Sequence, residues 1–205
     1  VYATFNNHKR GDFKPYVLKS TNKGKSWTSI SSNLPERGSV YDLIEDYKDP
    51  NILFAGTEFG VFVSIDAGEN WIQLKNGLPT IAVRDIEIQK DEDDLVLATF
   101  GRSFYVLDDY SMIRELAKNG KPSKSMLFET KPGLIFGTKK PYGGRGKSFQ
   151  GEAFYTVENP KQGVNFNYYL ADEFNSLKSI RKDKDKNSDY YHTFDEIRAE
   201  ANEDR

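Results

Sequence analysis

Five charged side chains, spread over two loops and two strand starts, are the residues of this sequence best suited to shared chemistry. Hydrolysis of a glycosidic bond requires two carboxyl groups about 5–9.5 Å apart, and Glu58 and Asp85 are acids that could lie on one wall of such a site. The alternative to a catalytic role is a structural one. In it, Asp42 and Asp85 cap the start of an inner strand, and Glu58 is a solvated or salt-bridged loop residue. The candidate ligand-binding residues are Glu58, Arg84, Asp85, Arg102 and Asp42.

Other catalytic and metal chemistries have little support in the composition. The sequence contains no Cys, and its two histidines, His8 and His192, lie near opposite ends of the chain. A thiolate metal site is therefore excluded. A His-rich metal site or a His-based catalytic triad is not favoured, because the two histidines are far apart in the sequence. The glycine-rich run at residues 143–146 lacks the Lys-Ser/Thr ending of a phosphate-binding loop, so it is interpreted as a linker. We expect neither a cofactor nor a metal.

Charge and hydropathy limit the classes of partner. The chain has 205 residues and a net charge of −2, from 29 Lys and Arg against 31 Asp and Glu. Because basic residues do not dominate, nucleic acid is not an expected partner. No run of about 18 apolar residues occurs, so no membrane-spanning helix is expected. The first residues, VYATFNN, are typical of a strand rather than of a signal peptide.

A repeat of 43–44 residues positions the candidate side chains. Ser20 and Ser64 begin two matching segments at an offset of 44, and Val40 and Val83 begin two more at an offset of 43. The central unit contains four short β-branched or aromatic runs separated by turn residues, which predicts four strands. These strands are expected at residues 40–45, 52–56, 61–65 and 71–74. Four strands in 40–45 residues is the period of a β-propeller blade.

The flanking units are incomplete versions of the central one. The first unit begins at its second strand, residues 1–5, and a loop over residues 6–15 leads to a strand at residues 16–19. The third unit has strands at residues 83–89, 95–99 and 104–107, a short helix at 111–118, and an outer strand expected at 126–128 or 133–136. A closed propeller has about 4–8 blades, so we expect most of the ring to lie outside this sequence.

Two segments, residues 20–27 and 64–71, follow the S-x-D-x-G-x-x-W pattern called an Asp box. The Asp side chain accepts hydrogen bonds from amides of the turn, and Asn22 can do the same in the first copy. The Gly provides a positive φ, and the Trp packs its ring against the strands. A catalytic role for Asp66 is less favoured than this structural one. The residues concerned are Ser20, Asn22, Gly24, Trp27, Ser64, Asp66, Gly68 and Trp71.

The order of strands sorts the loops into two ends. In a four-stranded antiparallel unit, the loops between strands two and three lie at the same end as the connections between units. The Asp-box turns lie at the other end. Glu58 and Arg102 are in loops of the first kind, and Asp42, Arg84 and Asp85 are near the beginning of innermost strands. We therefore expect any ligand to bind at the end opposite the Asp boxes.

Three segments resemble bacterial sortilin-like propeller proteins, which are often labelled BNR-repeat glycosyl hydrolases. They are residues 56–64, 78–86 and 97–109, and the resemblance is closest over residues 1–136. This chain has Phe100 where the family usually has His. Further along, residues 149–155 and 159–170 look like the first two strands of the family's β-sandwich domain, and residues 172–184 and 193–200 are similar to a helical insertion in that sandwich.

The resemblance implies an all-β chain: a partial β-propeller of four-stranded blades, then the start of a β-sandwich with a helical insertion. The expected divisions are C-terminal blades at residues 1–136, a Gly-rich linker at 137–150 and a truncated Ig-like sandwich at 151–205, with further sequence at both ends.

The implied function is binding of a peptide, protein or glycan outside the cytoplasm, in a protein that is secreted, periplasmic or on the cell surface. The alternative is a glycoside hydrolase whose catalytic carboxylates lie largely outside this sequence. A scaffold that only docks a neighbour is the third expectation.

Overall fold

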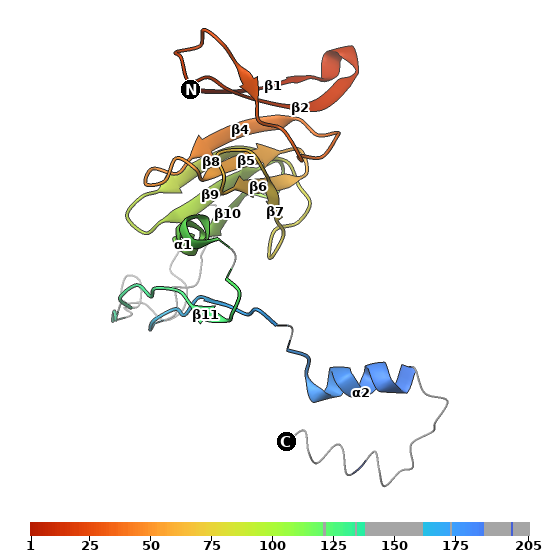
Figure 1. Cartoon of the computed structure of the whole chain (residues 1–205), viewed down its shortest axis with the longest axis vertical. Coiled ribbons are helices and arrows are strands. Elements are labelled where there is room, and N and C mark those ends of the chain that lie inside the picture. The colour runs from red at the N-terminus through yellow and green to blue at the C-terminus, as the bar shows by residue number, and fades with distance from the viewer. Residues whose placement is uncertain (121, 134, 138–161, 173, 187–197, 199–205) are drawn as a thin grey trace, which may run out of the picture.

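The computed structural model describes residues 1–120, 122–133, 135–137, 162–172, 174–186 and 198. Most of its regular structure consists of strands in antiparallel sheets, so the all-β class predicted from the sequence is confirmed. The helices of the described residues are a 3₁₀ turn at His8–Arg10, α1 at Met112–Asn119 and α2 at Leu177–Lys186. Three sheets stack one upon another, and α1 lies beneath the third (Figure 1).

The middle sheet is a four-stranded antiparallel meander in the order β4-β5-β6-β7. Its strands are β4 (Val40–Glu45), β5 (Leu53–Thr57), β6 (Gly60–Ser64) and β7 (Ile72–Leu74). All four predicted strands are present, and their bounds differ from the prediction by one residue at most. Short apolar runs punctuated by Asp, Pro and Gly therefore encode this meander locally.

The first and third sheets each contain three strands. The first has the order β1-β2-β3 and the third the order β10-β9-β8. Their bounds are β1 (Tyr2–Asn7), β2 (Asp12–Lys19), β3 (Thr28–Ser29), β8 (Val83–Gln89), β9 (Asp94–Thr99) and β10 (Phe104–Leu107).

The loop predicted at residues 6–15 is much shorter than expected, because β1 and β2 remain paired as far as Asn7 and Asp12. The carboxylate of Asp12 accepts hydrogen bonds from Asn7, from the Tyr16 hydroxyl and from the Lys14 amide, and these bonds extend the hairpin.

The outer strand predicted for the third unit was placed wrongly. Residues 126–128 do form a strand, β11 (Met126–Leu127), but it pairs with β12 (Tyr168–Tyr169) instead of with β10. Residues 133, 135 and 136 are in no strand. The helix α1 separates β10 from β11 and carries the chain past the third sheet (Figure 1). The β11–β12 pair therefore connects the segment predicted as propeller with the segment predicted as sandwich.

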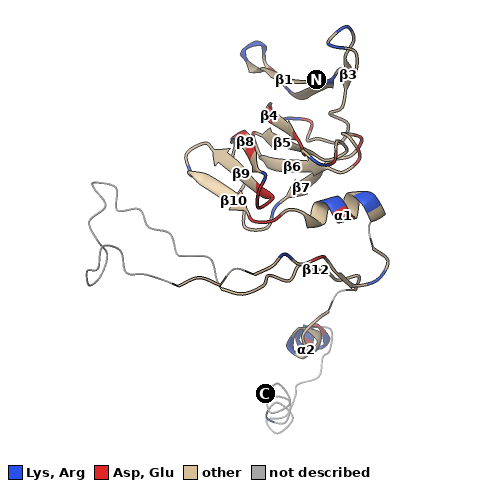
Figure 2. Ribbon diagram, turned by 90° about the vertical axis from the view of Figure 1, so that its left-hand side faces the viewer, with Lys and Arg blue, Asp and Glu red and all other residues tan. Residues whose placement is uncertain are grey.

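The remaining predictions for the C-terminal part are only partly covered by the structure. The predicted strand at residues 149–155 lies outside the described residues, as does the predicted helix at 193–200 apart from residue 198. The predicted helix at residues 172–184 corresponds to α2, which begins and ends a few residues later. Figure 2 shows α2 apart from the sheets, with charged residues along it.

Two apolar cores hold the three sheets together. Phe54 of β5 packs toward the third sheet with Val61, Ile86 and Leu97. Leu53 and Ala55 of β5 face the first sheet instead. The core on that side also contains Val17, Leu34, Phe62 and Trp71. Both faces of the middle sheet are covered, which explains why every residue of β5 and β6 is buried. Burial of apolar surface on both faces is the main stabilising term of the stack.

The two Asp-box segments form the same turn in different surroundings. In the second, Asp66 accepts the Asn70 amide at 2.8 Å and the Ser64 hydroxyl accepts the Gly68 amide at 2.8 Å, as the pattern predicts. Gly68 has φ +97°, and a Cβ there would lie 2.8 Å from Ile30, so this glycine is required both by backbone conformation and by space. Trp71 is 4% exposed, whereas Trp27 is 41% exposed.

Candidate ligand-binding face

The strand register places the five candidate residues at one end of the sheets. Val40 pairs with Thr57, and Val83 pairs with Thr99, so the beginnings of β4 and β8 lie beside the ends of β5 and β9. The loops that contain Glu58 and Arg102 follow directly. The Asp-box turns follow the opposite ends of the strands, which is the separation that the sequence predicts.

Two β-bulges shape this end. The register shifts between Val40 and Asp42 on β4 and between Val83 and Asp85 on β8, which makes Tyr41 and Arg84 the extra residues. A bulge bends its strand and re-aims a side chain, and bulges are frequent beside functional sites. Here the two bulged residues meet, because the Arg84 guanidinium carbon lies 3.8 Å from the centroid of the Tyr41 ring.

A second aromatic ring completes the stack. The Arg84 guanidinium carbon lies 5.2 Å from the centroid of the Phe100 ring. The amide of Phe100 donates to the Ala82 carbonyl at 2.9 Å, and the amide of Glu58 donates to the Ser39 carbonyl at 3.0 Å. Phe100 therefore occupies in the third sheet the position of Glu58 in the second. Its side chain is 68% exposed, so the stack of Tyr41, Arg84 and Phe100 faces solvent.

Two of the candidate carboxylates bind the main chain. Asp42 accepts the Ile86 amide at 2.9 Å and so connects the middle sheet to β8. Glu58 accepts the Ser39 amide at 3.4 Å. Asp85 and Arg102 are exposed, and no hydrogen bond or ion pair joins the side chain of either to another described residue. No direct interaction joins Glu58 to Asp85 among the described residues either.

Tyr41 and Phe100 are site residues that reasoning from the sequence alone did not select. Tyr41 and Arg84 both follow a strand-opening Val and precede an Asp, at the repeat offset of 43. This spacing indicates that Tyr41 and Arg84 occupy equivalent positions of the repeat. It could not show that both positions are bulged, because a bulge is visible only in the register of the paired strand.

A second cluster of charges lies at the opposite end, where α1 meets the sheets (Figure 2). Arg114 of α1 donates from Nη2 to Asp46 at 2.6 Å and from Nη1 to Asp93 at 2.7 Å. The Tyr110 hydroxyl donates to Asp46 at 2.6 Å, and the Tyr47 hydroxyl donates to Asp93 at 2.5 Å. The helix is thereby fixed to loops of two different sheets, so this cluster is structural.

The two carboxyl groups of this cluster are held ionised. Burial alone would raise the pKa of Asp46, but hydrogen bonds from Arg114 and Tyr110 outweigh it, and the pKa is lowered from its usual 3.8. Burial opposes ionisation of Asp93 as well, yet hydrogen bonds from Tyr47 and Arg114 lower its pKa further. The same environment raises the pKa of Tyr110, through burial and its bond to Asp46.

We expect the folded state to lose stability in acid through these two groups. A carboxyl whose pKa is lower in the folded than in the unfolded state stabilises the fold above the unfolded pKa, and this stabilisation disappears as the pH falls. The urea concentration at the unfolding midpoint should therefore begin to decrease as the pH falls below about 5 and should continue to decrease below about pH 3. Asp46→Asn should make the midpoint less sensitive to acid, and an unchanged pH dependence in that variant would contradict the assignment.

Comparisons with known proteins do not assign this chain to a family. Scans of the sequence against protein-family models and against curated proteins both returned no match. In the part of the chain that the structure describes, neither helix has the length and apolar character needed to cross a bilayer. No cluster of three or more His, Cys, Asp or Glu side chains suited to a metal ion occurs among the same residues.

Proposed function

We propose that the three stacked sheets are blades of a β-propeller and that this protein is a peptide- or protein-binding module. Three features support the propeller: the repeat of 43–44 residues, the four-stranded antiparallel meander of the middle unit, and the face-to-face stacking of the sheets. A propeller presents the loops of one end as a shared surface. The resemblance to sortilin-like proteins supports a location outside the cytoplasm.

The observation that carries the binding proposal is the exposed stack of Tyr41, Arg84 and Phe100. Arginine and aromatic residues are enriched at protein interfaces and dominate their binding energy. The Arg84 guanidinium lies over the Tyr41 and Phe100 rings, and no described carboxylate pairs with it, so its N–H groups remain able to bind a ligand carboxylate. A planar guanidinium of this kind recognises a carboxylate with two parallel hydrogen bonds.

The carboxylates favour binding over glycoside hydrolysis. A hydrolase needs two acids free to act on the glycosidic bond, but Asp42 and Glu58 each accept a main-chain amide. Their contacts are those of residues that hold a strand start and a loop. Of the three candidate acids, only Asp85 has no side-chain partner among the described residues.

The proposal is tested by screening the protein against immobilised acidic peptides and glycans and measuring the affinity of the peptides retained. Arg84→Ala should weaken binding by about tenfold or more, as expected for loss of an interface arginine worth at least about 1.4 kcal/mol. Arg84→Lys should also weaken it, because an ammonium group lacks the planar fork. Arg10→Ala is the matched control, since Arg10 is exposed on the 3₁₀ turn.

Two results would contradict the proposal. One is binding that Arg84→Ala leaves unchanged while circular dichroism shows the variant to be folded. The other is release of reducing sugar from the glycans that is lost in Asp85→Asn, which would assign the face to a hydrolase.

A further inference from the structure

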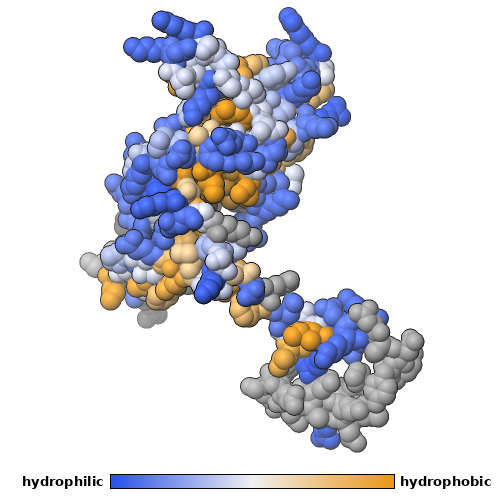
Figure 3. Space-filling view, viewed as in Figure 1, coloured by the Kyte–Doolittle hydropathy of each residue, from blue (hydrophilic) through white to orange (hydrophobic). Residues whose placement is uncertain are grey.

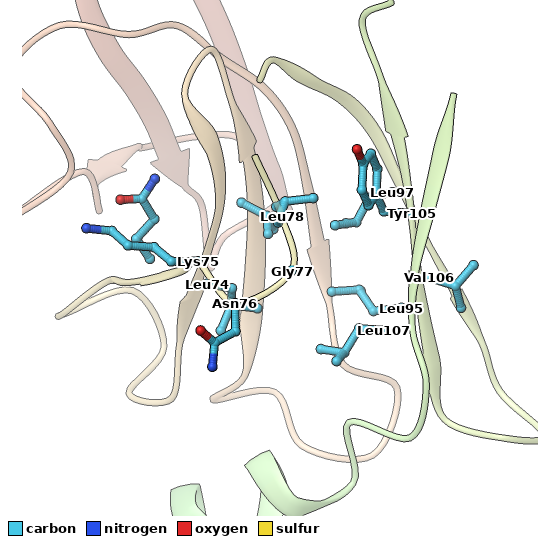
Figure 4. A pocket seen from close by; sticks show the side chains of 12 residues that line it. Leu74, Lys75, Asn76, Gly77, Leu78, Leu95, Leu97, Tyr105, Val106 and Leu107 are labelled. Carbon is cyan, nitrogen blue, oxygen red and sulfur yellow. The ribbon is translucent and has the colours of Figure 1, made fainter. Parts of the chain in front are cut away.

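A cleft of about 490 Å³ opens between the middle and third sheets, and Tyr41, Arg84 and Phe100 are not among the residues that line it. Apolar side chains from both sheets and from the loop between them form its wall, including Leu97 and Tyr105 of the third sheet and Leu78 of the loop (Figure 4). The space-filling view shows hydrophobic surface in the middle of the stack (Figure 3). Clefts of about 300–1,000 Å³ with mainly apolar walls are typical of sites that bind small ligands.

The internal repeat identifies what this cleft is shaped to hold. Its wall contains Val61, Leu78 and Tyr105. At the repeat offsets of 44, 44 and 43, these residues correspond to Val17, Leu34 and Phe62. The latter three are buried in the core between the first and middle sheets, and the ring packed among them is that of Trp71. The cleft is therefore the counterpart of the Trp71 site, one repeat further along.

The Trp71 site shows how an indole is held there. The indole Nε1 donates to the backbone carbonyl of Ile30 at 2.7 Å, so the ring's only polar atom is satisfied while the ring is buried. Leu74 stands at the repeat offset of 44 from Ile30, and it lines the cleft. The cleft thus offers an apolar wall together with the equivalent stretch of main chain.

Among the described residues, the third sheet has no strand that would carry a tryptophan into the cleft. In the middle sheet, Trp71 immediately precedes β7, which pairs antiparallel with β6. The strand of the third sheet that corresponds to β6 is β10. Among the described residues, no strand pairs with the outer edge of β10 as β7 pairs with β6. The chain enters α1 after β10 instead of forming a second hairpin. An uncovered edge of this kind is a template for an added strand.

We propose that the cleft binds the tryptophan side chain of an extended segment of a partner protein, which adds antiparallel to the free edge of β10. The indole would occupy the counterpart of the Trp71 site, and the main chain of the partner would complete the third sheet as β7 completes the middle one. This site is separate from the face formed by Tyr41, Arg84 and Phe100, so it stands independently of the function proposed above.

The chain itself provides the probe. A fluorescein-labelled peptide with the sequence of residues 69–76, ENWIQLKN, contains the tryptophan and β7. We expect its fluorescence anisotropy to rise on titration with the protein. Replacing its tryptophan by alanine should weaken binding by about tenfold or more, which corresponds to at least about 1.4 kcal/mol, because buried aromatic anchors dominate binding energy. N-acetyltryptophanamide should compete weakly, since it has the indole but cannot form a strand.

Variants of the protein locate the binding. Tyr105→Ala and Leu78→Ser change the cleft wall and should each weaken the peptide by about tenfold. Two variants are used so that one is still informative if the other fails to fold. Phe13→Ala is the matched control, because Phe13 is an exposed aromatic residue on β2. Amide hydrogen exchange should slow in β10 when the peptide is bound.

Three outcomes would overturn the proposal. The alanine peptide could bind as tightly as the tryptophan peptide, or the cleft variants could bind as tightly as the unaltered protein. In the third, the protein self-associates in a way that excludes the peptide and is abolished by Trp27→Ala. That result would assign the cleft to the exposed tryptophan of a second copy.

Discussion

Arg114→Met is expected to lower the free energy of unfolding by about 3–5 kcal/mol, the range for removing one partner of a buried ion pair. The Asp46 side chain is fully buried, and that of Arg114 is 14% exposed, so water cannot replace the lost guanidinium at Asp46. The helix α1 has only eight residues and depends on such tertiary contacts, because isolated helices of this length are unstable. Urea unfolding followed by circular dichroism measures the change.

Lys118→Met provides the control for this experiment. Lys118 is on the same helix, is exposed, and makes no ion pair with a described residue, so its replacement should change the free energy of unfolding by less than about 0.5 kcal/mol. The double variant Asp46→Asn with Arg114→Met should lose less than the sum of the two single variants, because the pair is coupled. Equal losses at Arg114 and Lys118 would refute a structural role for the cluster.

Trp71→Ala is expected to lower the free energy of unfolding by about 3–5 kcal/mol, as large-to-small changes of buried aromatic residues do. The ring is packed between the first and middle sheets with Val17, Leu34 and Phe62. Its removal leaves a cavity and also deprives the Ile30 carbonyl of its indole donor. Thermal or urea unfolding of the purified variant gives the value.

Trp27→Ala is the matched control for Trp71→Ala, because the two residues occupy the same position of the repeat. Trp27 is 41% exposed, since no described sheet packs against the outer face of the first sheet. We expect a loss of less than about 1 kcal/mol. A loss at Trp27 as large as that at Trp71 would show that the turn shared by the two segments, and not the packing between sheets, determines the effect.

The contrast between the two tryptophans has a simple physical origin. Each ring lies on the side of its own sheet that faces the preceding sheet in the sequence. Trp71 of the middle unit has the first sheet as this neighbour, whereas Trp27 of the first unit has no such neighbour among the described residues. The proposed cleft is the complementary case, because there both neighbouring sheets are present and no described residue places a tryptophan ring between them. One repeat unit thus explains a buried tryptophan, an exposed one and a site ready to accept one.

Much of the fold followed from local patterns. The strand at residues 40–45 and the strand at residues 83–89 have the predicted bounds. Short runs rich in β-branched and aromatic residues between turn signals specify a strand without reference to distant parts of the chain. The turn at Asp66 was equally local, since its hydrogen bonds join residues four apart. The prediction of an outer strand for the third unit was wrong because strand pairing depends on tertiary contacts. Met126 pairs with β12, which is distant in the sequence, and not with β10.

The sequence by itself determined the repeat of 43–44 residues, the positions of most strands, the two turns and the end of the sheets at which the candidate residues lie. All of these depend on spacing along the chain. Only the tertiary structure decided that Tyr41, Arg84 and Phe100 stack, that Arg114 reaches Asp46 across 68 residues of sequence, and that a tryptophan site is open between two sheets. These features arise when separate sheets pack, and their geometry depends on bulges and neighbours that no local pattern encodes.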